Sequence, residues 1–296
     1  MAVEMMGSTV PRRQLGRALR EARMAARMTV RAAARTLEWS EAKVWRIETG
    51  QVSMRSHDVE TTCRVYGVAD DLTEALKALA EETRARGWWH SYGDAIPSWF
   101  DVFVALEGAA SEMRMYEAEL VPGLFQTAAY THALILRRRP DLPHVDLERR
   151  VLVRMHRQGL VTRAADPTML DVVLNEAAIR RPLGEPNVMA QQCRHLIELS
   201  RLPNVTLRVV PFSAGWHLGC ESGPFVILRF PTDGEGRDLE PPTVYVQGLT
   251  GALHLDRPHE VEQFDAVHAD IVRTIRDDTG DRSRALLQGA AREHDR

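Results

Sequence analysis

Residues 41–46, EAKVWR, bring together an acid, a small residue, two cations and an aromatic side chain. If Val44 faces the inside of a helix, the other five lie on its outer surface. Such a helix can enter the major groove of DNA, where its side chains meet base edges and phosphates. This stretch therefore offers the chemistry of nucleic-acid recognition. With flanking polar residues, the predicted DNA-binding set is Thr29, Arg31, Ser40, Glu41, Ala42, Lys43, Trp45, Arg46, Gln51 and Ser56.

Two short helices around a turn are needed to position these side chains. Thr29 and Ser40 are favoured N-cap residues, so we expect helices over Val30–Leu37 and Glu41–Thr49. Gly50 stands where a helix often ends in a left-handed residue. Small and apolar residues would pack the two helices together, and the first of them matters most for their close approach: Ala34, Leu37, Val44 and Ile47. The alternative is an Ala-rich hairpin that serves only as a packing unit.

Residues 12–68 resemble the DNA-binding domain of the XRE (Cro/repressor-like) regulators. The resemblance is carried by SEAKVWRIETG and by the following SHDVETTCRVYGV. This family usually has Gly at the turn, where this chain has Glu38, so either Glu38 carries a positive φ or the turn is built differently. Val30 stands where the family often has a Gln that contacts the DNA backbone, and that contact would be lost.

The surrounding sequence predicts three further helices in this part of the chain. The first covers residues 12–26, with Leu15 and Leu19 inside, and its arginines on the other faces: Arg13, Arg17, Arg20 and Arg23. The next two cover residues 56–66 and 71–86, with Ser56 and Asp70 as N-caps. We expect their inward residues to be Val59, Cys63, Tyr66, Leu72, Leu76 and Leu79.

The charge of the chain is distributed unevenly. Residues 11–50 hold ten basic residues and four Glu, a net charge of +6, whereas the whole chain carries −3, so the rest carries −9. A basic head on an acidic body is expected of a DNA-binding protein with a separate second domain.

The length of the chain predicts a two-domain protein. The expected elements make residues 1–86 an all-α helix-turn-helix domain and residues 87–296 an α+β domain. The 44% hydrophobic and 27% charged residues are ordinary for a globular protein. No apolar run approaches the ~18 residues that a membrane helix needs, and no signal peptide is recognisable, so a cytoplasmic location without membrane contact is expected. The three cysteines show no metal or disulfide spacing.

The domain boundary should lie at the start of the Gly87–Gly93 segment, whose two tryptophans we expect to pack on the second domain rather than stack on bases. Residues 121–123, Val-Pro-Gly, suggest a type II turn. Strands are expected over residues 111–120, 169–175, 205–210, 225–230 and 243–246. Helices are expected over residues 97–110, 126–138, 145–162, 187–200, 258–277 and 281–292.

Three runs in this domain carry a second resemblance: residues 106–135, residues 174–184 (LNEAAIRRPLG) and residues 203–231. They are similar to the C-terminal domain of the actinobacterial WhiJ-like, Scr-family antitoxin-like regulators. The resemblance implies regulation of development or secondary metabolism, and often a small acidic partner protein encoded nearby. It implies no established enzyme activity.

Two groups in the second domain could carry chemistry. His217, Cys220 and Glu221 could form a nucleophilic site, although neighbours within one loop rarely point at one another. Arg180 and Arg181 cannot share one helix face. We expect one of them to pair with Glu176 or Glu185, while the other could hold an anionic effector or an acidic partner. The weaker effector- or partner-binding set is therefore Glu176, Arg180, Arg181 and His217.

No spacing predicts a metal site or a cofactor, and we expect no enzyme activity. The favoured hypothesis is a dimeric, sequence-specific transcriptional regulator with a C-terminal sensing or partner-binding domain. The alternative is an antitoxin that neutralises a small protein and regulates its own operon. A third reading is an enzyme with a DNA-binding head.

Overall fold

A computed structural model of the chain describes residues 9–82, 98–163, 167–232, 238, 240–277 and 280–295. Among these, residues 9–82 and 101–109 form one compact unit, and residues 98–100 and 110–295 form the other. The helix α6 (Ser98–Ala109) is divided between them. The predicted boundary after residue 86 and the Gly87–Gly93 segment lie outside the described residues.

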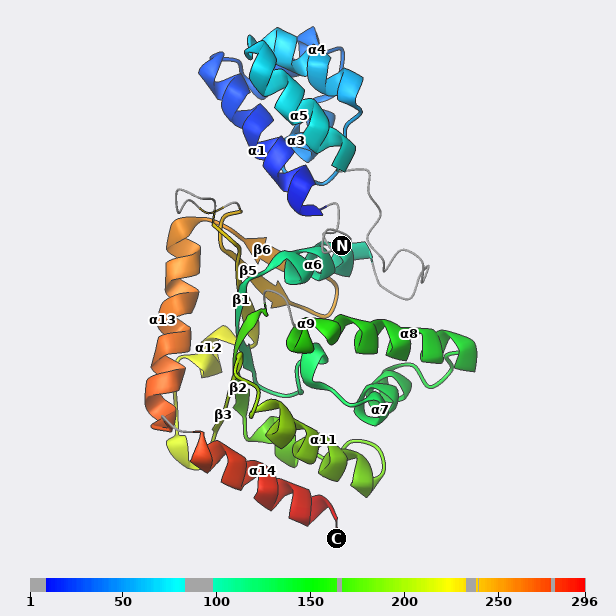
Figure 1. Cartoon of the computed structure of the whole chain (residues 1–296), viewed down its shortest axis with the longest axis vertical. Coiled ribbons are helices and arrows are strands. Elements are labelled where there is room, and N and C mark those ends of the chain that lie inside the picture. The colour runs from blue at the N-terminus through cyan, green and yellow to red at the C-terminus, as the bar shows by residue number, and fades with distance from the viewer. Residues whose placement is uncertain are drawn as a thin grey trace. The chain divides into compact units, whose positions relative to one another are not determined.

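Residues 9–82 form five helices, as predicted (Figure 1). Their bounds are α1 (Thr9–Ala25), α2 (Val30–Thr36), α3 (Glu41–Glu48), α4 (Ser56–Tyr66) and α5 (Asp70–Glu82). One buried cluster joins α1, α3, α4 and α5 through Leu19, Ile47, Val59, Cys63 and Leu76. A second cluster joins α2 to α4 through Ala33, Leu37 and Tyr66.

Close approach of α1 and α3 depends on two glycines. A Cβ on Gly16 of α1 would lie 2.4 Å from the carbonyl oxygen of Ile47 in α3. A Cβ on Gly50, which follows α3 and has φ +69°, would lie 2.8 Å from the Cα of Arg13. Any side chain at position 16 would clash with the backbone of α3 and force the two helices apart. These glycines therefore set how closely α1 packs across the end of α3.

Five expectations for this unit are wrong. Ser56 and Asp70 are the first residues of α4 and α5 rather than their N-caps, and Arg55 occupies the cap position of α4 without a side-chain bond. Leu72 is 50% exposed, because the buried stripe of α5 begins one turn later, at Leu76. Arg13 and Arg23 are buried rather than on outer faces; for Arg23 the reason is an ion pair described below.

The second unit is built on a six-stranded sheet with the strand order β3-β2-β1-β4-β5-β6. Strands β1 (Glu112–Glu117), β2 (Met169–Asn175) and β3 (Val205–Val210) are parallel to one another. Strands β4 (Phe225–Arg229), β5 (Thr243–Gln247) and β6 (Ala252–Leu255) continue the sheet in antiparallel pairs. The mixed sheet with its helices confirms the predicted α+β class.

Helices cover both faces of this sheet (Figure 1). Helix α13 (Pro258–Ile275) lies on one face, and the other face carries α7 (Ala128–Arg138), α8 (His144–Arg157) and α11 (Pro186–Leu199). The segment between β1 and β2 contains α7 (Ala128–Arg138), α8 (His144–Arg157) and α9 (Gly159–Thr162). The segment between β2 and β3 contains α10 (Ala177–Arg180) and α11 (Pro186–Leu199). The short α12 (Gly219–Ser222) precedes β4, and α14 (Asp281–His294) contacts α11 and β3.

Side chains of alternate residues point to opposite faces of a strand, and the core follows this rule. Tyr116 of β1 packs with Val173, Phe225 and Val244 against Ile271 of α13. Met113 and Met115 are fully buried on the opposite face of β1, and the partly buried Glu117 follows them on that face.

Several details of this unit differ from the sequence-based expectations, among them the single helix expected over residues 145–162, which is divided into α8 and α9. Residues 121–123 do not form a type II turn, because Gly123 lacks the positive φ that this turn requires and begins a 3₁₀ turn, Gly123–Phe125. Helix α7 begins at Ala128 rather than Gln126, since the Thr127 hydroxyl caps it by accepting from Tyr130 N. Strand β6 was not predicted, and it has only four residues. No helix in the described part of the chain is long and apolar enough to cross a membrane.

Candidate nucleic-acid interface

The turn between α2 and α3 is closed around Glu38. Glu38 has φ +56°, so the residue that replaces the expected glycine takes the left-handed conformation. Trp39 N donates to Ala34 O at 2.8 Å across this turn. Ala34, Val44 and Ile47 are 3%, 2% and 5% exposed, which confirms that they form the inner face of the two helices.

The N-caps predicted for α2 and α3 are both present. The Thr29 hydroxyl accepts from Ala32 N at 3.1 Å, and the Ser40 hydroxyl accepts from Lys43 N at 3.1 Å. Each cap satisfies an amide of the first turn that has no partner within the helix. The two hydroxyls therefore fix where α2 and α3 begin.

A buried ion pair ties α3 to α1. Arg23 donates from Nε to Glu48 Oε1 at 2.6 Å and from Nη2 to Glu48 Oε2 at 2.8 Å, while its Nη1 donates to Met28 O. The hydrogen bond to Glu48 raises the pKa of the Arg23 guanidinium above its usual value. A two-pronged pair of this geometry holds α3 in one orientation as well as one position.

The outer face of α3 is open to solvent. Glu41, Ala42, Trp45 and Arg46 are exposed, and Trp45 keeps 54% of its surface accessible. Trp45 therefore adds one large aromatic side chain to a face that also carries the charges of Glu41 and Arg46. The remaining members of the predicted set are exposed or partly exposed, namely Thr29, Arg31, Ser40, Lys43, Gln51 and Ser56.

Lys43 has a partner that the sequence did not suggest. Its ammonium lies 3.7 Å from the ring centroid of Trp39, a cation–π contact, and the side chain is only partly exposed. Trp39 belongs to the turn, so this contact holds the Lys43 charge beside the start of α3. Trp39 precedes α3, so the spacing rules that relate side chains within one helix do not link it to Lys43.

Exposed cations are numerous in the unit that contains α3. In residues 9–82 the exposed arginines are Arg20, Arg27, Arg31, Arg35, Arg46, Arg55 and Arg64. Five of them lie within residues 11–50, the segment with a net charge of +6. Phosphate contacts from such side chains position a protein on DNA without reading its sequence.

The candidate residues of the second unit do not form one site. Glu176 Oε1 accepts from Arg180 Nε at 3.0 Å, which confirms the expected internal pair, and Glu176 Oε2 accepts from Phe212 N. Arg180 also pairs with Glu293, and Arg181 pairs with Glu119. Glu176 and Arg180 therefore join α10 to the end of β3 and to α14, whereas Arg181 points elsewhere.

His217 lies in the core beside α12. It is 2% exposed, its ring meets the Tyr116 ring edge-on at 5.7 Å, and burial lowers the pKa of the imidazole. Cys220 is exposed whereas His217 is buried, and in the part of the chain that the structure describes no hydrogen bond joins the imidazole to the Cys220 thiol. Within the described residues, no hydrogen bond or ion pair joins His217 to Glu176, Arg180 or Arg181. The described residues also hold no cluster of three or more metal-ligating side chains.

The fold and the site of the first unit define a helix-turn-helix domain, and residues 14–76 match the family model described as a helix-turn-helix domain. Residues 100–288, more than half of the chain, match the model described as a domain of unknown function (DUF5753), and the protein belongs to that family. No curated protein and no solved structure matches the chain. The helix-turn-helix match supports a DNA-binding regulator.

Proposed function

We propose that the protein is a sequence-specific transcriptional regulator of the XRE type, which reads DNA with the outer face of α3. The observation that supports this is the division of one short capped helix into a buried inner face and an exposed outer face. Val44, Ile47 and Glu48 anchor α3, and Glu41, Ala42 and Trp45 remain accessible. The proposal includes membership of the actinobacterial WhiJ-like group that the sequence resembles, and it assigns no catalytic step to the chain.

Genome-wide mapping of bound DNA tests the proposal, with the protein's own promoter as a control. We expect a small number of strong sites that share one motif. Uniform coverage that follows only protein concentration would contradict sequence-specific binding, because electrostatic binding alone does not discriminate sites.

Two variants of α3 distinguish base recognition from phosphate contact at such a site. Lys43→Ala should weaken operator binding and reduce discrimination by ~1–3 kcal/mol if Lys43 reads a base. Arg46→Ala should weaken all sequences alike and lower the salt dependence by about one unit of slope, as expected of a phosphate contact. Lys77→Ala is the matched control, since Lys77 lies on α5 and pairs with Glu74 at 2.7 Å. Unchanged gel-shift affinity of the Lys43→Ala/Arg46→Ala double variant would exclude α3 as the recognition helix.

We further propose that the regulator binds an inverted repeat as a two-fold dimer. A single module of this size buries only ~600–1,000 Å² against DNA, and duplication of the contact multiplies its discrimination. Two-fold symmetry then requires half-sites separated by ~10–10.5 base pairs or a multiple of that distance.

The second unit is proposed to sense a ligand or to bind a protein partner. A partner-binding role, as in the antitoxin alternative, is favoured by two aromatic side chains in the loop after β3. Phe212 is 62% exposed and Trp216 is 64% exposed. Exposed aromatic residues close together are typical of interaction surfaces. Co-purification of one stoichiometric small protein from a native lysate, lost in the Phe212→Ser/Trp216→Ser variant, would support that role. Recovery of the chain without such a protein would contradict it.

A further inference from the structure

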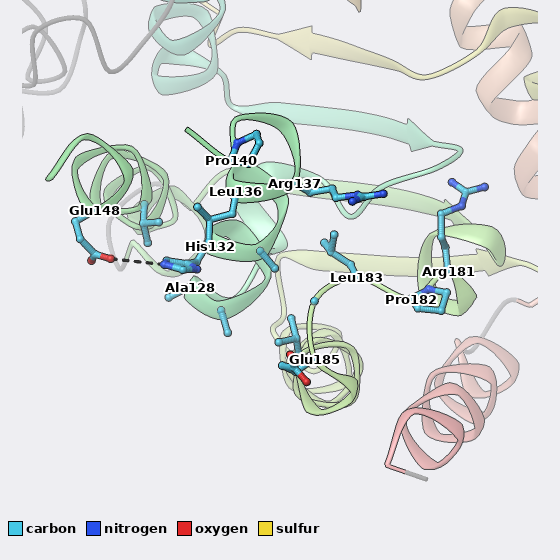
Figure 2. A pocket seen from close by; sticks show the side chains of 15 residues that line it. Ala128, His132, Leu136, Arg137, Pro140, Glu148, Arg181, Pro182, Leu183 and Glu185 are labelled. Carbon is cyan, nitrogen blue, oxygen red and sulfur yellow. Dashed lines mark ion pairs between the residues drawn. The ribbon is translucent and has the colours of Figure 1, made fainter. Parts of the chain in front are cut away.

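The second unit contains a pocket of about 1020 Å³ between α7, α8 and the segment that leads into α11 (Figure 2). Small-molecule sites in proteins usually have volumes of ~300–1,000 Å³, so this pocket is large enough for a ligand of ordinary size. Its walls come from three segments of one unit, residues 128–140, 148–151 and 181–188.

Small residues create this hollow. Ala128, Ala129 and Ala133 lie on the face of α7 that lines the pocket, and their methyl groups leave space that larger side chains would fill. Gly184 has φ +68°, and a Cβ there would lie 2.9 Å from the Cβ of Ala133. Gly184 therefore lets the segment before α11 approach α7 closely, which closes one side of the pocket.

The middle of the pocket is apolar. Leu136 from α7 and Leu183 from the facing segment lie between its two charged ends (Figure 2), and Val151 and Val188 complete this lining. An apolar body can lose its contact with water against these side chains.

The two ends differ in charge. At one end Glu148 lies within 3.9 Å of His132 and 3.8 Å of His144. At the other end lie Arg137 and Arg181 (Figure 2). Arg181 already pairs with Glu119, whereas Arg137 is exposed and has no ion-pair partner within the described residues.

A single anionic group suits this second end better than a polyanion. Glu185 also lines the pocket, just before α11, and its carboxylate would repel a ligand with several negative charges. One guanidinium without a carboxylate partner can hold one carboxylate through two parallel hydrogen bonds. The positions of the charges thus match a molecule with an apolar body and one negative end.

We infer that this pocket binds a small apolar organic anion, with its carboxylate or equivalent group on Arg137 and its apolar body along α7 between Leu136 and Leu183. This ligand would be the signal that the second unit senses, and that role rests on the proposed function. Arg137 is the residue that selects for charge, and the alanines of α7 select for an apolar body.

Calorimetric titration of the full chain with octanoate tests the site, with octan-1-ol and octylammonium as ligands of equal length and different charge. We expect octanoate to bind saturably with one molecule per chain, octanol about tenfold more weakly, and octylammonium more weakly still. Equal affinity for all three, or no saturable binding of octanoate below ~1 mM, would overturn the inference.

Three variants locate the binding. Arg137→Gln should weaken octanoate about tenfold and leave octanol unchanged, because only the charged contact is lost. Arg138→Gln is the matched control, since Arg138 is the exposed neighbour that does not line the pocket, and it should bind as the native chain does. Ala128→Leu should weaken the binding of octanoate and octanol alike, because the larger side chain occupies space in the pocket. If this variant unfolds, the comparison of Arg137→Gln with Arg138→Gln still tests whether Arg137 binds the ligand. Equal affinities of these two variants for octanoate would refute the site.

Separate gel shifts keep the two proposals distinguishable. A chain that binds octanoate but no specific DNA supports the pocket and contradicts the regulator. A chain that binds its operator but not octanoate supports the regulator and overturns the pocket.

Discussion

At the scale of single residues, Glu38 is a point of backbone strain inside the helix-turn-helix. A side chain with a Cβ disfavours the left-handed conformation by about 1–2 kcal/mol, and Glu38 holds φ +56°. Glycine would remove that cost but would lose more conformational entropy on folding. We expect Glu38→Gly to stabilise the N-terminal unit by about 0.5–1 kcal/mol, measured by urea denaturation.

Glu38→Ala is the control, because it removes the carboxylate and keeps the Cβ. It should leave the free energy of unfolding close to that of the native chain. If both variants stabilise the N-terminal unit equally, the charge of Glu38, and not its φ, destabilises the native chain.

Glu117 is the second residue with an expected energetic effect. Burial raises the pKa of its carboxyl from 4.5 to about 8. The folded chain therefore binds one more proton than the unfolded chain between those pH values, so the free energy of unfolding falls as the pH rises. The stabilisation that is fully present below pH 4.5 is lost as the pH rises through about 8. We expect Glu117→Gln to melt at a higher temperature than the native chain at pH 9 and at a similar temperature at pH 5. Each kcal/mol gained in the free energy of unfolding should raise the melting temperature by ~2–4 °C.

Glu119→Gln provides the matched comparison, since Glu119 is an exposed neighbour that pairs with Arg181. Its melting temperature should follow the native pH dependence. A native-like pH dependence for Glu117→Gln as well would show that the Glu117 carboxyl ionises freely in the folded chain.

At the scale of elements, the contact between α2 and α3 depends on Ala34. Ala34 is 3% exposed, so a longer side chain there has no free space. We expect Ala34→Leu to cost about 1–3 kcal/mol through overpacking and to weaken DNA binding, because the same contact orients α3. Thermal melting and a gel shift measure the two effects.

Ala78→Leu is the control for Ala34→Leu, because Ala78 is exposed on α5 and the same change there adds no crowding. It should melt and bind as the native chain does. An Ala34→Leu chain with normal stability would mean that the two helices are not in tight contact.

The elements that the sequence predicted correctly are those with local signals. Thr29, Ser40 and Gly50 mark helix ends through contacts only a few residues away, and each was predicted. Strand β2 was predicted at its observed bounds, because a run of apolar β-formers reports burial directly. The six-stranded order could not be predicted in this way, since pairing between strands is not a local property.

Several of the errors arise where distant residues decide. Arg23 looked like a surface residue, yet it pairs with Glu48, 25 positions away, and no local rule joins them. Lys43 was predicted as a freely exposed cation, and its contact with Trp39 depends on how the turn folds back. The pocket on α7 was not predicted either, because three alanines on one helix face look like ordinary packing until the facing segment is known.

At the scale of the whole molecule, the proposed dimer makes a prediction about mass. We expect the full chain to sediment at twice its 33.4 kDa mass and to protect two half-sites related by a two-fold axis. Analytical ultracentrifugation with a footprint on the mapped operator measures both. A monomer that protects one undivided, non-palindromic site would contradict the dimer.

The three cysteines have one further consequence. Cys63 and Cys193 are buried, and burial raises the pKa of their thiols, to about 12 for Cys193, whereas Cys220 is exposed. Only a thiolate reacts readily with a maleimide, so the native chain should take up one label at Cys220 near neutral pH. A fluorophore attached there and a second dye on the operator would report the distance between the second unit and bound DNA without any engineered cysteine.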